Sequence, residues 1–257
     1  MTVARLAVVV QLCGASALCF SSLQAAQVLP ANCTGEGIEL QVLGSGGPEL
    51  LADRAASSYL IRDRGRGRVL VDIGGGSAQR FAQAQGKVED LDLILLTHLH
   101  NDHIEGLPNL WMTGWFLLGR TQPLTVWGPP GTQAMVDGMY QMYAFDIEQR
   151  SNAFNDPENL RIEVHEIKAP GRVLDRGGLT VHAIRAEHDD GNPAFSYAIE
   201  AHQHKVLLTG DTRLFDGLKA LAEDSDVVVS NVLAMPEQLA RKPEMQGVVA
   251  KLMTTEE

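Results

Sequence analysis

Short apolar runs alternate with polar, turn-forming stretches along this chain, and they predict the buried strands of an α/β protein. The clearest run is residues 91–96 (LDLILL), a near-continuous apolar stretch typical of a strand covered on both faces. A helix is expected over residues 132–145, because apolar positions recur there every three or four residues after a Pro-Pro-Gly turn. Further strands are expected at residues 161–167, 179–185, 194–200 and 205–208.

Two parts of the chain share one pattern. RVLVDIGGG begins at residue 68 and resembles KVLLTGD, which begins 137 residues later; EDLDLILLT begins at residue 89 and resembles EDSDVVVSN, 134 residues later. A strand–helix–strand unit is therefore predicted to occur twice, although a chance similarity between two such units is the alternative. Two units packed sheet to sheet, with their helices outside, would give a four-layer αβ/βα sandwich.

The N-terminal segment differs from the rest. Arg5 precedes an apolar run that ends near Ala25 and Ala26, so residues 1–26 are interpreted as a secretory signal peptide, with a membrane anchor as the alternative. The remaining residues 27–257 are predicted to form one domain, since a chain of 257 residues with 45% hydrophobic content can bury one large core. We expect a secreted or periplasmic protein without stable membrane association. Cys33 is then the only cysteine left, which excludes an intramolecular disulfide.

The net charge of the chain bears on which partners are expected. The formal net charge of −11 becomes −12 when the single positive charge of the leader, Arg5, is removed. An acidic chain disfavours a polyanionic partner, so no nucleic acid is expected as a partner. The basic cluster of Arg62, Arg64, Arg66 and Arg68 is interpreted as the tip of a hairpin.

The strongest chemical signal follows the apolar run at residues 91–96. His98, His100, Asp102 and His103 place four nitrogen and oxygen ligands within six residues, directly after a predicted buried strand. Such a ligand set suits zinc, and loops at strand ends commonly carry chemistry. The alternative is a hydrophilic loop with scattered histidines.

The other histidines are divided by their settings. His188 follows a predicted strand and is the best candidate for a further metal ligand. His165 and His182 lie within predicted strands and are interpreted as packed or edge residues. His202 and His204 are assigned to an exposed turn.

These motifs resemble a known family. THLHNDH at residues 97–103, GLPNL at 106–110 and PLTVWGPPGT at 123–132 are similar to the metallo-β-lactamase superfamily, in the branch with ribonuclease Z and secreted arylsulfatases and phosphodiesterases. The resemblance covers about residues 38–233 and implies the metallo-β-lactamase fold, the four-layer sandwich. It also implies two zinc sites, with Mn²⁺ or Fe as alternatives. In it His98, His100 and His188 hold one metal, Asp102 and His103 hold the second, and Asp211 bridges them. Asp102 and Asp211 are the catalytic carboxylates, and Asp72 is expected to orient a ligand histidine.

The resemblance led to a functional prediction: a secreted zinc-dependent hydrolase that uses a metal-bound hydroxide on small phosphodiesters or sulfate esters. Ribonuclease Z carries a His-Glu pair where this chain has Ser230-Asn231, and this departure, with export and charge, argues against tRNA maturation. Asp211 argues against an antibiotic-degrading lactamase. The alternatives are a catalytically incompetent, truncated metal-binding member or a lactonase or β-lactamase-like hydrolase. A small-molecule ester is the expected partner, and a homo-oligomer is compatible with the sequence.

Two expectations concern the edges of the site. The family has a further helix and strand, which deliver a last histidine, beyond the capping-box pattern at residues 254–257; the second metal site is therefore expected to be weakened. Trp111, Trp115 and Phe116 are predicted to form an apolar wall beside the metals, with burial in the core as the alternative.

Overall fold

The computed structural model describes residues 37–188, 193–233 and 241–254, all within the compact unit Ala31–Glu257. The predicted leader lies outside these ranges, so cleavage and export stay predictions. Within the described ranges, no helix combines the length and apolar character that a membrane crossing requires.

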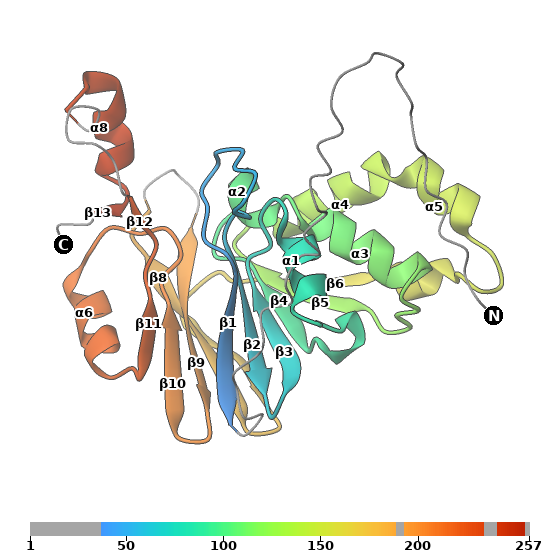
Figure 1. Ribbon diagram of the computed structural model, residues 1–257, viewed down its shortest axis with the longest axis horizontal. Coiled ribbons are helices and arrows are strands. Elements are labelled where there is room, and N and C mark those ends of the chain that lie inside the picture. Colours follow the sequence, from blue (N-terminus) through green and yellow to red (C-terminus); the bar gives the residue numbers. More distant parts are fainter. Residues whose placement is uncertain (1–36, 189–192, 234–240, 255–257) are drawn as a thin grey trace, which may run out of the picture. The chain divides into compact units, whose positions relative to one another are not determined.

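The first sheet has six strands in sequence order (Figure 1). They are β1 (Ile38–Gly44), β2 (Ser58–Asp63), β3 (Arg66–Val71), β4 (Leu93–Leu95), β5 (Leu124–Gly128) and β6 (Ile162–Glu166). The strands from β1 to β3 pair antiparallel, and those from β3 to β6 pair parallel. The carboxyl ends of β3 to β6 therefore meet at one edge of the sheet.

The second sheet has the order β11-β10-β9-β8-β7. Its strands are β7 (Gly171–Arg176), β8 (Leu179–Ala186), β9 (Ala194–Ala201), β10 (His204–Leu208) and β11 (Val227–Val229). All pairs are antiparallel except β10 with β11. A small parallel pair joins β12 (Val232–Leu233) to β13 (Met253–Thr254).

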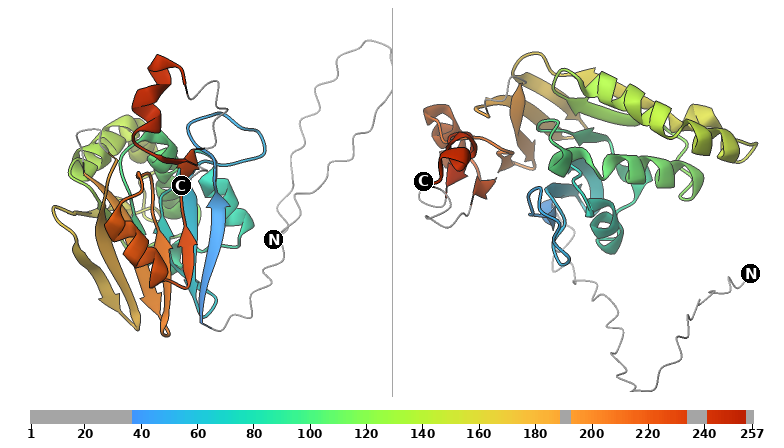
Figure 2. Two further views of the ribbon diagram at one scale, coloured as in Figure 1. Left: turned by 90° about the vertical axis from the view of Figure 1, so that its left-hand side faces the viewer. Right: turned by 90° about the horizontal axis from the view of Figure 1, so that it is seen from above.

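Helices cover the outer faces of both sheets, as Figures 1 and 2 show. The helices of the described ranges are α1 (Ser77–Gln83), α2 (Asn101–Ile104), α3 (Leu107–Phe116), α4 (Thr132–Met142), α5 (Ala144–Arg150), α6 (Asp216–Glu223) and α8 (Pro243–Val249), with short 3-10 turns η1 (Val88–Asp90) and η2 (Pro157–Leu160); α2 and α8 lie beyond the ends of the strands. Side chains of α1, α3 and α4 pack on the first sheet, and Leu218 of α6 packs on the second. A separate apolar core fills the space between the sheets. The predicted four-layer sandwich is confirmed.

Most predicted elements lie where the patterns placed them. The helix over 132–145 begins at Thr132, after Gly131 with a φ of 99°, and its first part ends at Met142. The repeated unit is real, because β3-α1-β4 and β10-α6-β11 both join parallel neighbouring strands through a helix. The arginine-rich hairpin turns at Arg64 and Gly65, both with positive φ. The helix expected to start after residue 254 falls on residues 255–257, outside the described ranges.

The histidines outside the main motif lie in the settings predicted for them. His165 is exposed in the edge strand β6 and stacks on Trp127 with ring centroids 4.4 Å apart, as expected for an edge residue. His202 and His204 are both exposed, as predicted. The Nε2 atom of His202 also lies 2.7 Å from a carboxylate oxygen of Asp63, so this turn links the second sheet to the first.

Candidate metal centre

The predicted ligand motif lies at the carboxyl end of β4, between the two sheets. The chain stays buried from Leu93 to His98, and the carbonyl of Thr97 accepts a hydrogen bond from the backbone amide of Phe195 in the second sheet. His98 and His100 follow in extended backbone, and α2 then carries Asp102 and His103. The loop is therefore held by both sheets.

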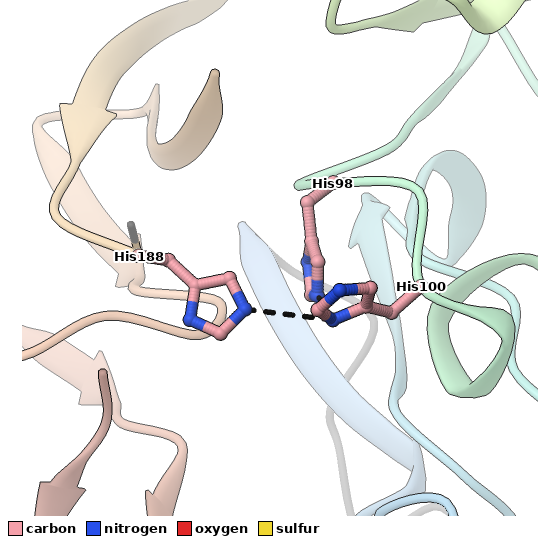
Figure 3. Close-up of side chains that lie close together, drawn as sticks. All are labelled: His98, His100 and His188. Carbon is pink, nitrogen blue, oxygen red and sulfur yellow. Dashed lines mark hydrogen bonds between the residues drawn. The ribbon is translucent and has the colours of Figure 1, made fainter. Parts of the chain in front are cut away.

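Three imidazoles converge in the first group of ligand atoms, His98, His100 and His188 (Figure 3). The Nδ1 atom of His100 lies 3.0 Å from Nε2 of His98 and 3.5 Å from Nε2 of His188. Zinc–nitrogen bonds of 2.0–2.1 Å at tetrahedral angles would place ligand nitrogens about 3.3 Å apart. The three nitrogens therefore fit one metal ion.

His188 comes from the loop after β8, so the second sheet contributes to this group. Its Nδ1 atom lies 3.2 Å from the carbonyl oxygen of Lys251, which can accept a hydrogen bond from the Nδ1–H group. In that tautomer the Nε2 atom has no proton and can bind a metal. The segment before β13 thus orients a ligand that was predicted from the sequence.

A second group shares His98 and adds His103 and Asp211. The Nε2 atom of His103 lies 3.5 Å from Oδ1 of Asp211 and 3.6 Å from Oδ2 of Asp102. The side chains predicted as metal ligands thus lie close together: five belong to these two groups, and Asp102 lies beside the second through its contact with His103. Their oxygen and nitrogen donors are of the kinds that divalent metal ions bind.

Asp72 takes the supporting position expected for it. Its carboxylate lies 2.7 Å from Nδ1 of His103 and accepts hydrogen bonds from the backbone amide and the hydroxyl of Thr97. Because an ionised carboxylate only accepts, Nδ1 of His103 carries a proton and Nε2 points toward Asp102 and Asp211. The imidazole is therefore presented in the form that binds a metal.

The ionisable groups hold opposing charges in close contact. Burial lowers the pKa of His98 to about 2, aided by the positive charge of His103. Burial alone would lower the pKa of His103, but the negative charges of Asp72 and Asp211 raise it well above its ordinary value. Burial would raise the pKa of Asp211, yet its contact with His103 lowers it. The surrounding carboxylates thus favour a positive charge on His103, and a metal cation bound at its Nε2 atom would replace that charge.

Glycine at position 74 allows the motif to pack against the end of β3. A Cβ atom on Gly74 would lie 2.0 Å from the carbonyl oxygen of Asp102. The neighbouring amide of Ile73 donates to the carbonyl of His103. Any side chain at residue 74 would push α2 away from the metal ligands that it carries.

One residue that contacts a predicted metal ligand was not identified from the sequence. Asn231 was noted only as a departure from the ribonuclease Z pattern, but its Nδ2 atom donates to Oδ1 of Asp211 at 2.8 Å. The available signal was its place in the repeat, since it lies 134 residues after Thr97, the residue that supports Asp72.

A cavity of about 580 Å³ borders the centre on the side of the loop 47–56, α1 and α2. Its lining includes Arg54, Arg80, Asn101 and Asp102. Asp102 belongs both to this cavity and to the metal centre, so a molecule bound there would reach the metal ligands. The lining also includes Glu49 and Glu105, so the cavity presents both cationic and anionic side chains beside the centre.

The predicted aromatic wall is wrong for both tryptophans. Trp111 and Trp115 are 2% and 3% exposed and pack in the core between α3 and the first sheet. Their indole nitrogens donate to the carbonyl oxygens of Leu160 and Asp156. Phe116 packs against the same core and carries the guanidinium of Arg150 over its ring. These side chains support the fold, which was the alternative interpretation.

Comparison with known proteins gives consistent findings. The family described as beta-lactamase superfamily domain matches residues 67–251. A ribonuclease Z of Mycobacterium bovis is 36% identical over 199 residues, which span 76% of this chain and 70% of that protein. The human short-form tRNase Z structure has a TM-score of 0.63 at 21% identity and covers 84% of this chain and 93% of its own. The Zn²⁺-bound PqqB structure from Methylobacterium extorquens has a TM-score of 0.56 at 17% identity, covering 83% and 78%.

The relatives correct two expectations. Small phosphodiesters or sulfate esters were predicted as substrates, and nucleic acid was excluded as a partner, whereas the sequence relatives are named ribonuclease Z. The error came from using net charge as a criterion. Asp102 and Asp211 carry negative charge at the centre, and cations bound by these expected metal ligands would offset that charge.

Proposed function

Because the chain belongs to the beta-lactamase superfamily and is 36% identical to a ribonuclease Z over 199 residues, we propose that it is a metal-dependent hydrolase that cleaves phosphodiester bonds in RNA. The observation that carries the proposal is the pair of ligand groups that share His98 and include Asp211. A phosphodiester carries negative charge, which two neighbouring cations can bind.

Zinc is the metal we propose, held by His98, His100 and His188 in one site and by Asp102, His103 and Asp211 in the other. The imidazole and carboxylate donors suit zinc, and the PqqB neighbour is Zn²⁺-bound. When bound, two such ions would lower the pKa of water toward about 7 and would stabilise negative charge that develops on a phosphate.

The protein's own groups would prepare this chemistry. Asp72 keeps Nδ1 of His103 protonated and so keeps Nε2 available. The carboxylate of Asp211 lies in the group with His98 and His103, where its negative charge would balance that of a bound cation. Arg54 and Arg80 line the cavity beside Asp102, together with Glu49 and Glu105, and their guanidinium groups could contact the phosphates of an RNA backbone.

The test measures RNA cleavage by the purified 257-residue chain after chelation and after addition of zinc. A labelled tRNA precursor, an unstructured RNA oligonucleotide and a DNA oligonucleotide serve as substrates. We expect cleavage of RNA only with zinc, and its loss in His188→Ala and Asp211→Asn. His204→Ala is the matched control, because this exposed histidine lies outside both ligand groups.

Intact RNA after incubation with a chain shown to bind zinc would refute the proposed substrate. Equal cleavage of RNA and DNA would show a phosphodiesterase without the proposed preference for RNA. Unchanged cleavage in Asp211→Asn would refute the assignment of the metal centre.

A further inference from the structure

Asn231 lies at a position that the second sheet fixes closely. It follows β11, which pairs parallel with β10, and β10 leads to Asp211. The backbone amide of Asn231 donates to Oγ1 of Thr209 at 3.2 Å, and the amide of Thr209 donates to the carbonyl of Val229 at 3.0 Å. The backbone of Asn231 is therefore tied to the strand end that carries Asp211.

The side chain of Asn231 connects Asp211 to the first sheet. Its Nδ2 atom donates to Oδ1 of Asp211 at 2.8 Å, and its Oδ1 atom accepts a hydrogen bond from the hydroxyl of Tyr59 in β2 at 3.0 Å. An ionised carboxylate can only accept, so the amide NH₂ must face Asp211. The amide oxygen then accepts the hydrogen bond from Tyr59, so the donor and the acceptor are defined in both of these hydrogen bonds.

Tyr59 is suited to hold this amide in one orientation. Its side chain is 4% exposed, and burial, together with the negative charge of Asp72, raises its pKa to about 12. The hydroxyl therefore keeps its proton across the physiological range and stays a donor. A buried tyrosine donor would be left unpaired if the amide of Asn231 turned around, which is costly.

The repeated unit shows the same arrangement in its first half. The backbone amide of Thr97 donates to Asp72, as the amide of Asn231 donates to Thr209, and these residues are related by the separations of 134 and 137 residues. In the first half, Thr97 and Asp72 support His103. In the second half, Asn231 contacts Asp211 directly.

We propose that Asn231 is a positioning residue for the metal centre, which holds the carboxylate of Asp211 toward His103, and that Tyr59 fixes the amide of Asn231 in the required direction. The same oxygen, Oδ1 of Asp211, faces Nδ2 of Asn231 and Nε2 of His103. Holding this oxygen restricts rotation of the carboxylate and so presets the ligand. The inference rests on the proposed role of Asp211 as a metal ligand.

The test measures zinc affinity by competition with a chromophoric chelator, on the folded chain and without RNA. The variants are Asn231→Leu, Tyr59→Phe and the double variant, with Asp211→Ala as the reference for loss of a ligand. Groups that orient a metal ligand typically contribute about 10- to 100-fold to affinity, so Asn231→Leu should bind zinc about tenfold less tightly at the site that includes Asp211. Tyr59→Phe should show a smaller loss.

Coupling between the two positions separates positioning from general packing. If Tyr59 acts through Asn231, Tyr59→Phe should have no further effect on zinc affinity in the Asn231→Leu background. The visible spectrum of bound Co²⁺ should change in both single variants, since it reports the ligand geometry. Tyr140→Phe is the matched control, because this tyrosine hydroxyl donates to Leu160 in the core under α4.

Wild-type zinc affinity and Co²⁺ spectra in Asn231→Leu, with weaker binding in Asp211→Ala, would overturn the inference and leave the proposed function standing. No change in Asp211→Ala would refute the metal centre itself. Additive losses in the double variant would overturn the role of Tyr59. If Asn231→Leu does not fold, Tyr59→Phe keeps the aromatic ring, and a wild-type affinity in that variant would then overturn the proposal.

Discussion

Replacing Asp72 by asparagine tests whether one buried carboxylate sets the chemical form of a metal ligand. Asp72 is fully buried, and its oxygen lies 2.7 Å from Nδ1 of His103, which is also buried. In Asp72→Asn the amide oxygen can still accept from the backbone of Thr97, but its NH₂ group would face Nδ1 of His103. The imidazole would then carry its proton on Nε2, the atom that points toward Asp211.

The magnitude follows from the burial of this contact. Loss of a group that orients a metal ligand costs about 10- to 100-fold in affinity, or about 1.4 to 2.7 kcal/mol. Removal of one partner of a buried ion pair costs about 3 to 5 kcal/mol of unfolding free energy. Asp72→Asn should therefore lose zinc affinity and also stability in the absence of zinc.

Zinc competition titrations and urea unfolding with a chelator measure the two effects separately. Asp92→Asn is the matched control, since the side chain of Asp92 is also buried and accepts a hydrogen bond from Nε of Arg68 at 2.6 Å. This contact lies near the amino ends of β3 and β4, whereas the metal ligands lie at the carboxyl ends. It should lower stability without changing zinc affinity. Wild-type zinc affinity in Asp72→Asn would refute the argument that Asp72 selects the metal-binding form of His103.

Three further predictions concern burial, close packing and pH. Trp115→Ala should lower the free energy of unfolding by about 3 to 5 kcal/mol in chemical denaturation, and KM for RNA should not change, because Trp115 packs in the core. Gly74→Ala should weaken zinc binding to the site with Asp102 by at least tenfold in the same titration, because the new Cβ would displace this segment. The raised pKa of His103 means that its proton is present below that pKa and must leave when a cation binds. Zinc affinity should thus fall as pH decreases, and calorimetry in buffers of different ionisation enthalpy should detect proton release that is absent in His103→Ala.

The metal ligands could be predicted because most of them lie close together in the sequence. His98, His100, Asp102 and His103 fall within six residues and follow a buried strand, so both the kind of ligand and its position in the fold are evident from one segment. His188 and Asp211 also follow apolar strands, and the repeat pattern shows that such strand ends meet.

Asn231 and Tyr59 could not be found in this way. They are 172 residues apart, and they meet only because the two sheets pack face to face. An amide and a phenol carry no pattern typical of metal ligands, and their role depends on which hydrogen-bond partners the fold leaves to them. The local sequence around Asn231 or Tyr59 does not indicate these partners.

The strands β1, β5, β7, β12 and β13 were not predicted, and β1 and β7 were missed for a related reason. β1 and β7 are edge strands, and every residue of β7 is at least partly exposed, with charged residues at three of its six positions. Apolar runs predict strands that are covered on both faces, as for β4, and they lose this power at the edge of a sheet. Pairing with β2 and β8, more than local preference, accounts for these two strands.

The centre depends on how accurately the two sheets are placed on one another. The first sheet supplies four of the six ligands, and the second supplies His188 and Asp211. Buried contacts link the sheets beside the ligands: the hydroxyl of Tyr197 donates to the carbonyl of Leu96, just before the ligand motif, and Tyr59 donates to Asn231. Metal ions bound there would also link the two sheets. The buried hydrogen bonds and the metal ions would therefore stabilise the same packing of one sheet on the other. A mutation in the core between the sheets can therefore impair metal binding without touching a ligand.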